Sequence, residues 1–304
     1  MKELLDKVLE SCRPYIEKGQ LASYIPELAK ANKDEFGICV VDDNQMEHTG
    51  DYEKPFTMQS VAKPMILLMA LMDNGAETVQ KLVGVEATGK PFDAFNYSDQ
   101  ALNKEHINPM INTGAIMLCT LIKGDTYQEK FARLLDLTRR ISGNENLEVD
   151  EQVYLSEKAT GSKNRALAYM LKAYGMMHDD VEEVLDCYFR ACSIKVTTVD
   201  LAQIAYVFAH GGMDVKTGER LFEKEYARYV NAVLMTCGMY DGSGKFALKV
   251  GVPAKSGVGG GIMAIVPGRM GIGLYSPALD KNGNSTAGIK ALEQLSEHLE
   301  LSIF

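Results

Sequence analysis

The feature that most constrains this chain is an apolar run over residues 65–71 that directly follows Pro64. The run is long enough for a buried helix and too short to cross a bilayer. If the helix begins near Ser60, Pro64 falls in its first turn, where the missing N–H costs little. Lys63 lies three residues after Ser60, so both side chains then share one face. The sequence therefore predicts a hydroxyl and an amine in contact at the positive end of a helix dipole.

Ser-x-x-Lys is one arrangement used for a serine nucleophile, but the pair carries little weight alone. A chain of this length is expected to contain about one such pair by chance. The alternative is an N-capping serine beside a solvated lysine on an ordinary core helix. Other parts of the sequence therefore have to decide between a nucleophile and a cap.

The composition is that of an ordinary globular protein with an acidic balance. The 304 residues are 46% hydrophobic and 24% charged, and a chain of this length tends to divide its core between two subdomains. The net charge is −9, and no block of consecutive Lys or Arg residues is present. Because no basic field exists to attract phosphates, we expect no nucleic-acid partner and no membrane partner.

The N-terminal sequence and the cysteines indicate the compartment. Residues 1–10 alternate charged and apolar side chains, which is typical of an amphipathic helix, whereas a secretory signal needs an uninterrupted apolar segment. The six cysteines show no Cys-x-x-Cys spacing and are expected to be reduced, mostly buried thiols: Cys12, Cys39, Cys119, Cys187, Cys192 and Cys237. We therefore expect a cytoplasmic protein.

Two further kinds of site are not supported by the sequence. The five histidines have no metal-ligand spacing and no Glu at helical distance, so we expect no metal ion. The glycine run 259–261 lies between two strand-like segments and not between a strand and a helix, which argues against a nucleotide-binding loop.

The period of the apolar residues changes along the chain. Near both ends it is typical of strands, with an amphipathic helix at each terminus, and in the middle it is typical of helices. The expected strands are 36–41, 246–252, 261–266 and 270–275, with a hairpin turn at 42–44. The expected helices are 2–17, 60–73, 113–122, 127–141, 163–175, 179–190, 198–210, 223–237 and 286–301.

The economical fold class is α+β. One antiparallel sheet is assembled from both chain ends and flanked by the terminal helices, and an all-helical subdomain is inserted between them. We expect residues 1–57 and 240–304 to form the sheet lobe and residues 58–239 to form the helical lobe. Ser60 lies at the boundary, and pockets tend to form between lobes, so the active site is expected there.

Several polar clusters follow one another along the chain, and capping or core packing explains each of them taken alone. They are Ser23-Tyr24-Ile25-Pro26, Gln59-Ser60-Val61-Ala62-Lys63, Asn108-Pro109 with Asn112-Thr113-Gly114-Ala115, Ser156-Glu157 with Asn164, Tyr188, Gly238-Met239-Tyr240-Asp241 and Pro253-Ala254-Lys255-Ser256-Gly257-Val258-Gly259-Gly260. Together, and in this order, they resemble bacterial serine-dependent glutaminases, which share the β-lactamase/transpeptidase-like fold of penicillin-recognising serine enzymes. The match covers nearly the whole chain. Two departures, Thr113 for alanine and Lys163 for arginine, remove no presumed functional group.

The resemblance implies a catalytic role for four residues. Ser60 would attack the γ-carboxamide carbon of L-glutamine, form an acyl-enzyme and release ammonia, with Lys63 as the general base. Lys63 must then be neutral, which requires a pKa about 2 to 3 pH units below the usual value of about 10.4, and Lys255 is the neighbouring cation expected to favour the neutral form. Tyr240 would relay a proton to the leaving ammonia, and the backbone N–H groups of Ser60 and Val258 would form the oxyanion hole.

The resemblance also implies the substrate site and the partners. The matching positions are Tyr24, Gln59, Ser60, Asn112, Glu157, Asn164, Tyr188, Tyr240 and Val258. A buried carboxylate at Glu157 suits the ammonium of an amino acid, and amides and tyrosine hydroxyls suit its carboxylate. The chemistry requires no cofactor. Because relatives form dimers or tetramers, we expect L-glutamine as the substrate and a homodimer or homotetramer.

Two alternatives stay open at this point. Another serine acyl-transfer enzyme of the same fold, a β-lactam or peptide hydrolase, would share Ser60 and Lys63, but such enzymes work outside the cytoplasm. A catalytically silent amino-acid-binding relative is expected to have lost one of Ser60, Lys63 or Tyr240. Ammonia release from glutamine without cleavage of a chromogenic cephalosporin separates a glutaminase from the first alternative.

Overall fold

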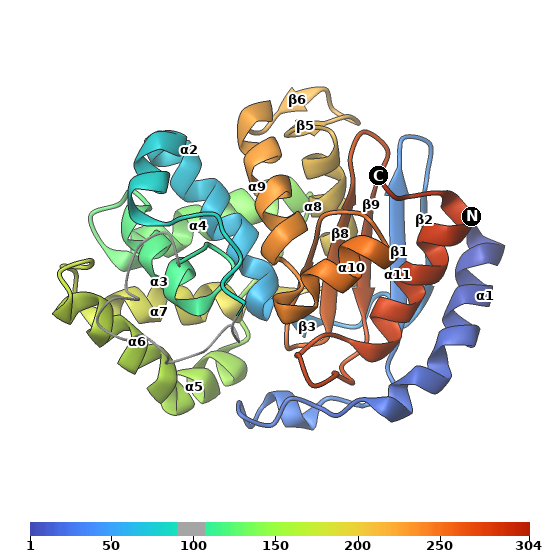
Figure 1. Cartoon of the computed structure of the whole chain (residues 1–304), viewed down its shortest axis with the longest axis horizontal. Helices are drawn as coiled ribbons and strands as arrows, with labels where there is room; N and C mark the ends of the chain where they lie inside the picture. Colours follow the sequence, from blue (N-terminus) through green and yellow to red (C-terminus); the bar gives the residue numbers. More distant parts are fainter. Residues whose placement is uncertain (90–106) are drawn as a thin grey trace.

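The computed structural model describes residues 1–89 and 107–304. Its centre is a five-stranded antiparallel sheet with the strand order β2-β1-β9-β8-β7. The strands are β1 (Gly37–Asp42), β2 (Met46–Gly50), β7 (Ala254–Ser256), β8 (Gly261–Val266) and β9 (Met270–Tyr275). Ile38 of β1 pairs with Leu274 of β9, which pairs in turn with Ile262 of β8. The predicted sheet built from both chain ends is confirmed (Figure 1).

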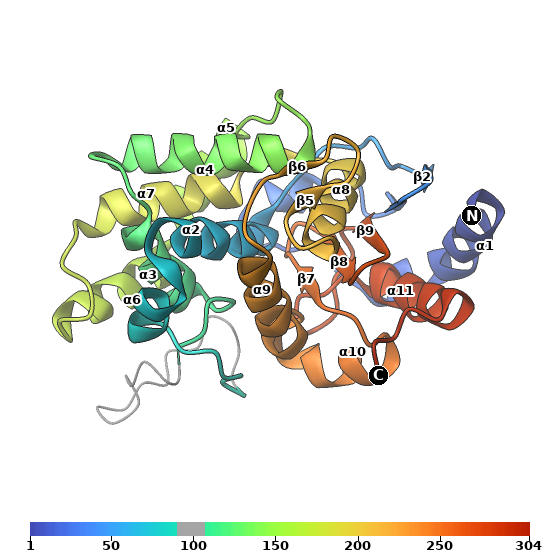
Figure 2. The ribbon, with the colours of Figure 1, turned by 90° about the horizontal axis from the view of Figure 1, so that it is seen from above.

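Helices cover both faces of this sheet, which explains why its central strands β1, β8 and β9 are buried along nearly their whole length. On one face, α1 (Lys2–Cys12) and α11 (Thr286–Leu299) lie side by side (Figure 2). Ile38 of β1 belongs to the apolar core beneath these two helices. The next residue, Cys39, packs instead against α8 (Thr198–Ala209) on the other face. The alternation of side chains along β1 therefore connects two separate layers of core.

Helix α8 approaches the sheet at backbone distance because two glycines of β9 face it. A Cβ atom on Gly271 would lie 2.1 Å from the carbonyl oxygen of Ala202, and one on Gly273 would lie 2.1 Å from that of Thr198. The sequence placed this helix within the helical lobe, residues 58–239, whereas the structure packs it on the sheet. Helical periodicity shows that a helix forms, but it does not show which layer the helix joins.

The remaining long helices gather on one side of the sheet, at the left and centre of Figure 1. They are α2 (Lys63–Leu82), α3 (Asn112–Leu121), α4 (Tyr127–Ser142), α5 (Glu151–Thr160), α6 (Ser162–Ala173), α7 (Val181–Cys192) and α9 (Lys224–Cys237). Side-chain oxygens of Thr126, Asp150 and Asp180 cap the N-termini of α4, α5 and α7. No helix in the described parts of the chain is both long and apolar enough to cross a membrane.

Short elements connect these layers. In the described residues, two further pairs of strands are β3 (Phe56–Thr57) with β4 (Lys195–Val196), and β5 (Met213–Asp214) with β6 (Glu219–Arg220). The 3-10 turns of this part of the chain are η1 (Arg13–Lys18), η2 (Leu28–Lys30), η3 (Gln59–Ala62) and η5 (Tyr240–Gly242). Strand β3 leads through η3 directly into α2, so the predicted nucleophile lies between the small β3–β4 pair and the first long helix of the helical part.

The strand predicted at 246–252 is wrong, because this segment begins with a helix, α10 (Ser243–Lys249), and β7 follows it. The apolar residues Phe246, Leu248 and Val250 alternate as they do in a strand. In the structure Phe246 and Val250 are buried one helical turn apart, while Leu248 is 88% exposed. In so short a segment, the spacing of two and the spacing of four produce the same pattern.

Helix boundaries also differ from the prediction, and one helix was missed. The first helix ends at Cys12 and not at residue 17, because Pro14 falls in the following 3-10 turn η1. Helix α5, which carries Glu157, was not predicted. Its apolar stripe is weak, with Val153 and Tyr154 buried but Leu155 exposed. The capping aspartate before it, at position 150, is the local signal that identifies the start of this helix.

Gly271→Ala is expected to lower the free energy of unfolding by about 2 to 3 kcal/mol, because the added methyl group overlaps the backbone of α8. Gly244→Ala is the matched control, since a Cβ atom there meets nothing within 4 Å and alanine favours the helix α10 that contains it. Urea unfolding followed by circular dichroism measures both variants. A Gly271→Ala protein as stable as the wild type would contradict the close packing of α8 on β9.

Candidate active site

The predicted contact between Ser60 and Lys63 is confirmed by the structure. Ser60 lies in the 3-10 turn η3, and Lys63 is the first residue of α2, with Pro64 in the first turn of that helix. Both side chains are buried, and Lys63 has no exposed surface. The Lys63 Nζ donates a hydrogen bond to Ser60 Oγ over 3.0 Å. The apolar run that follows is entirely buried, so α2 holds this pair on a rigid core helix.

A chain of hydrogen bonds continues from this pair into the helical part. The Lys63 Nζ also donates to Asn112 Oδ1 over 2.7 Å, and Asn112 is the first residue of α3. The same oxygen accepts a hydrogen bond from the Tyr188 hydroxyl of α7 over 3.2 Å. The Asn112 Nδ2 donates to Asn164 Oδ1 of α6 over 2.9 Å. Four of the predicted site residues are therefore joined to the serine through one buried network.

A second buried lysine approaches the site from the sheet. Lys255 of β7 has no exposed surface, and its Nζ donates to the carbonyl oxygens of Gly238 (3.0 Å) and Ser256 (2.6 Å). Its Nζ also lies 4.3 Å from the centre of the Tyr240 ring. Burial, together with the charge of Lys63, lowers the pKa of Lys255 well below its usual range. The site thus disfavours a positive charge on Lys255 itself, which weakens the expectation that Lys255 acts as a simple cation.

Two residues near the serine have a strained backbone conformation. Gln59, directly before it, has a φ of 48°, and Tyr240 has a φ of 53°. In the described residues only Glu300 shares a positive φ with them among the non-glycine residues. Burial raises the pKa of the Tyr240 hydroxyl, and the nearby Ser60 hydroxyl opposes this rise. The phenol therefore stays protonated at neutral pH, next to the serine. Backbone strain such as that of Gln59 and Tyr240 is common at functional sites.

The loop that contains Val258 packs directly on the backbone around Ser60. A Cβ atom on Gly257 would lie 2.6 Å from the Met58 carbonyl oxygen and 3.4 Å from the Ser60 nitrogen. A Cβ atom on Gly259 would lie 2.7 Å from the carbonyl oxygen of residue 57. Glycine at both positions permits this approach. The structure therefore brings Val258 to the serine, while its role in an oxyanion hole stays a prediction.

Two cavities meet at Tyr24, which is 56% exposed. The first has a volume of about 340 Å³, which suits an amino acid, and seven predicted residues line it: Tyr24, Gln59, Ser60, Asn112, Glu157, Asn164 and Tyr188. The second has a volume of about 700 Å³, and the predicted residues Tyr240 and Val258 line it together with Tyr24. All nine predicted substrate-binding residues therefore line one of two adjoining cavities, and the buried Lys63 lies behind Ser60, to which it is hydrogen-bonded.

The first cavity contains a buried carboxyl group without a cation. Glu157 of α5 is 6% exposed, and its Oε2 has no hydrogen-bond partner among the described residues. Burial raises the pKa of Glu157 to about 8, although Gln59 and Lys63 act in the opposite direction. An empty cavity therefore favours the protonated acid near neutral pH. An ammonium group entering the cavity would instead stabilise the carboxylate.

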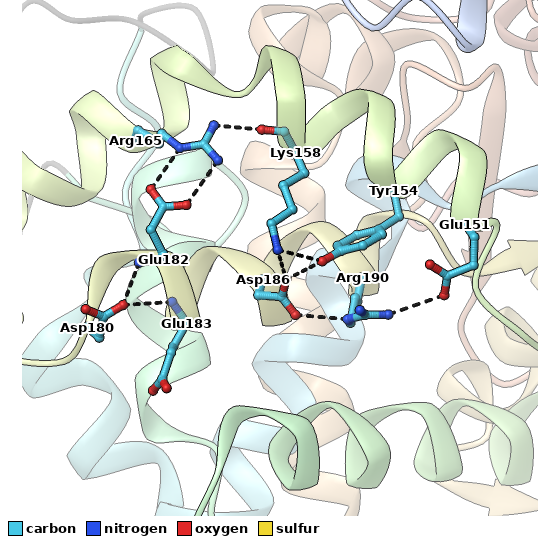
Figure 3. A network of polar contacts seen from close by, with 9 residues as sticks. All are labelled: Glu151, Tyr154, Lys158, Arg165, Asp180, Glu182, Glu183, Asp186 and Arg190. Carbon is cyan, nitrogen blue, oxygen red and sulfur yellow. Dashed lines mark hydrogen bonds and ion pairs between the residues drawn. The ribbon is translucent and has the colours of Figure 1, made fainter.

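A polar network on the outer side of α5, α6 and α7 supports this cavity (Figure 3). Asp186 of α7 bonds to Lys158 and Tyr154 of α5, and its second oxygen accepts from Arg190. Arg165 of α6 forms a two-pronged ion pair with Glu182 of α7 and donates to the carbonyl oxygen of Lys158. The three helices that carry Glu157, Asn164 and Tyr188 inwards are therefore tied together on their outward side.

Other residues of the first cavity were not assigned a role from the sequence. They are Ile25, Thr160, Gly161, Ser162, Lys163 and Cys192. The Cys192 carbonyl accepts a hydrogen bond from Gln59 Nε2 over 3.4 Å, so this residue helps to orient the side chain before the nucleophile. No sequence signal distinguishes Cys192 from the other buried cysteines. In residues 1–89 and 107–304, no group of three or more His, Cys, Asp or Glu residues is placed to hold a metal ion.

The fold and the buried Ser–Lys pair define a serine-dependent hydrolase with the β-lactamase-like fold. The sequence model of the Glutaminase family matches residues 19–304. Over the full length of both chains, the sequence is 51% identical to the glutaminase of Clostridium tetani and 48% identical to glutaminase 2 of Clostridium perfringens. The chain therefore belongs to the Glutaminase family, and the predicted family and fold are confirmed.

A solved structure agrees with this assignment. It is the Bacillus subtilis glutaminase in covalent complex with 5-oxo-L-norleucine, formed by reaction of that protein with 6-diazo-5-oxo-L-norleucine. The two sequences are 39% identical, 99% of each chain is covered, and the TM-score is 0.90. At this identity the likeness extends beyond the fold to the family.

Glu157→Gln is expected to remove a pH-dependent loss of stability. The carboxyl group has a pKa of about 8 in the folded protein, against 4.5 for an ordinary Glu in the unfolded chain. Between these values the unfolded state binds fewer protons than the folded state, so the free energy of unfolding falls as the pH rises, and it stops falling above the folded pKa. Without glutamine, the wild type should lose more stability than Glu157→Gln between about pH 5.5 and pH 8. Denaturant unfolding at both pH values measures this, and parallel losses in the two proteins would show that the carboxyl is already ionised.

Proposed function

We propose that this chain hydrolyses the γ-carboxamide of L-glutamine to L-glutamate and ammonia through an acyl-enzyme on Ser60. The observation that carries this proposal is the hydrogen bond between Lys63 Nζ and Ser60 Oγ at a cavity that holds the buried carboxyl group of Glu157, whose Oε2 has no hydrogen-bond partner among the described residues. Membership of the Glutaminase family supports the substrate and the amidohydrolase class. The covalent complex of the Bacillus subtilis relative supports attack by an enzyme side chain on a glutamine-like carbonyl carbon.

In the first step Lys63 acts as the general base. A neutral Lys63 amine that donates one hydrogen to Asn112 Oδ1 directs its lone pair at the Ser60 hydroxyl, because Nζ lies within hydrogen-bond distance of both groups. As the bond from Ser60 Oγ to the carboxamide carbon forms, the hydroxyl proton moves to Lys63. The backbone N–H groups of Ser60 and Val258 stabilise the negative charge on the carbonyl oxygen. The packing of the 257–259 loop against residues 57–60 supports this arrangement.

Tyr240 completes the reaction on the side of the second cavity. Its buried, protonated phenol contacts Ser60 and donates a proton to the leaving nitrogen as the carbon–nitrogen bond breaks. Ammonia then leaves and water enters by way of the larger cavity, which Tyr240 lines. The water attacks the acyl carbon and gives a proton to the Tyr240 oxygen, and Lys63 returns a proton to Ser60 Oγ as that oxygen leaves the acyl carbon. Glutamate is released, and Ser60, Lys63 and Tyr240 return to their starting protonation states without a cofactor.

The first cavity recognises the amino-acid end of the substrate. Glu157 binds the α-ammonium group, whose positive charge favours the ionised carboxylate at this buried position. Asn164 and Tyr188, which the Asn112 amide holds in place, provide hydrogen-bonding groups for the α-carboxylate. Gln59 and Tyr24 line the same cavity next to the serine and at its mouth. The two substrate charges thus fix the distance at which the side-chain amide meets Ser60.

We also propose a cytoplasmic location and a homodimer or homotetramer. All six cysteines lie in the described part of the chain as buried, free thiols, which suits a reducing compartment. Large apolar side chains that stay exposed, such as Leu248 (88%) and Phe304 (84%), support association between copies. Light scattering is expected to give twice or four times the chain mass of 33.5 kDa. A mass equal to one chain at micromolar concentration would contradict the proposed oligomer.

Ser60→Ala is expected to reduce ammonia release from glutamine by roughly 10⁴-fold or more, because the acyl-enzyme no longer forms. Glutamine should still raise the melting temperature of this variant, since the first cavity is unchanged. The wild type should gain one adduct with 6-diazo-5-oxo-L-norleucine, which mass spectrometry locates on Ser60, and the variant should gain none. An adduct on another residue, or activity retained in Ser60→Ala, would remove the nucleophile assignment.

Lys63→Met should reduce activity to a similar extent, because it removes the proposed base and keeps most of the apolar side chain. Lys130→Met is the matched control. Lys130 is also buried, at 8% exposure, and its Nζ donates to the Thr120 carbonyl oxygen in a region away from the serine. Both variants lose a buried amine, so a loss of kcat confined to Lys63→Met separates catalysis from folding. Equal losses of kcat in both variants would contradict the assignment of Lys63 as the base.

A further inference from the structure

Two side chains of helix α7 point to opposite sides of the helix. Tyr188 is 2% exposed and points inwards, where its hydroxyl bonds to Asn112. Asp186, two residues earlier, points to the other side of the helix, towards α5 (Figure 3). Any contact that fixes α5 on Asp186 therefore also fixes α5 relative to Tyr188.

Asp186 is the acceptor on which the outer network converges. Its Oδ1 accepts from Lys158 Nζ over 2.6 Å and from the Tyr154 hydroxyl, and its Oδ2 accepts from Arg190 Nε over 2.9 Å. Its side chain is 19% exposed, so water screens these contacts less than those of a surface pair. Burial raises the pKa of Asp186, but its partners Lys158, Tyr154 and Arg190 outweigh this effect and keep the pKa below its usual range. The group is thus a firmly ionised anchor.

The partners of Asp186 lie on both sides of the position that faces the substrate. On α5, Tyr154 and Lys158 are one turn apart, and the Lys158 Nζ also donates to the Tyr154 hydroxyl over 2.9 Å. Glu157 lies between them, three residues after Tyr154, and faces the first cavity. A helix held at two points of one turn cannot rotate about its axis. The rotation of α5 determines how far the Glu157 carboxyl group reaches into the cavity.

Other contacts between these helices are more exposed. The ion pair from Arg190 to Glu151 spans 3.3 Å, and the Glu151 side chain is 60% exposed. The pair of Arg165 with Glu182 connects α6, not α5, to α7, and Glu182 is 47% exposed. Exposed pairs contribute little to holding a geometry. Asp186 is therefore the strongest polar anchor of α5 on α7 in the described residues.

We propose that Asp186 is a positioning residue that sets the Glu157 carboxyl group at the distance from Tyr188 and Asn112 that the α-ammonium of an amino-acid substrate requires. Asp186 does not touch the substrate and acts through Tyr154 and Lys158. The inference rests on the proposed function for the identity of the substrate. Its consequence is that loss of Asp186 weakens the binding of glutamine more than it slows the chemistry at Ser60.

The test is the kinetics of ammonia release by the full-length Asp186→Asn variant. The side chain keeps its size but loses its charge, so α5 is expected to rotate and the KM for glutamine to rise about 10-fold, with kcat within about threefold of the wild type. Lys158→Met, which keeps the apolar stem, should also raise KM. The double variant should raise KM no further than the larger single effect, because both changes break one anchor.

Asp73→Asn is the matched control. Asp73 of α2 binds Arg133 of α4 through two hydrogen bonds of 2.7 Å, and its side chain is 7% exposed. The Asp73→Asn variant loses a comparable ion pair away from the cavity, so a lower melting temperature with an unchanged KM is expected. The proposal is overturned if KM stays unchanged in Asp186→Asn and Lys158→Met, if Asp73→Asn raises KM equally, or if the effects of the two positions simply add. The wild type in the same assay tests the proposed function by itself, so the two failures are distinguishable.

Discussion

The structure depends on one buried amine. Lys63 has no contact with water, so its hydrogens need acceptors inside the protein, and an unpaired buried amine would cost several kcal/mol. Those acceptors, Ser60 and Asn112, come from different elements, and Asn112 is bonded in turn to Tyr188 and Asn164. Satisfying this amine therefore brings α2, α3, α6 and α7 to one point. The same bonds place the nucleophile, the base and the amino-acid cavity next to one another.

The sheet supplies the other half of the site by close approach of backbone. Glycines at 257 and 259 let the loop after β7 lie on the backbone around the serine, and β7 carries a second buried lysine, Lys255. Two buried amines and a buried carboxyl group at Glu157, whose Oε2 has no partner among the described residues, are costly for stability. Ionisable groups in such surroundings occur most often where a protein binds charge or moves protons. Their concentration around Ser60 agrees with a catalytic site and not with a capped core helix.

Much of the fold was predictable because its signals are local. The apolar periods of the central helices and of strands β1, β8 and β9 predicted these elements, and their order along the chain predicted a sheet shared by both ends. Each error in the predicted elements has a physical cause. The segment 246–250 fits two periods equally well, and α5 has a weak apolar stripe. Helix α8 joins the sheet because of Gly271 and Gly273, which lie some 70 residues further along the chain than the helix they contact.

The candidate site also combines features that the local sequence determined with features that depend on tertiary packing. The sequence by itself determined the contact of Ser60 with Lys63, because helical geometry brings residues three apart together whatever surrounds them. Tyr24, Glu157 and the other binding positions came from resemblance to glutaminases, not from spacing. Only the tertiary structure decided that Asn112 accepts a hydrogen bond from Lys63, 49 residues away in the chain. It also decided that Glu157 is desolvated and that Asp186 anchors α5. Desolvation and contacts between distant segments arise from packing, and no local pattern in the chain encodes them.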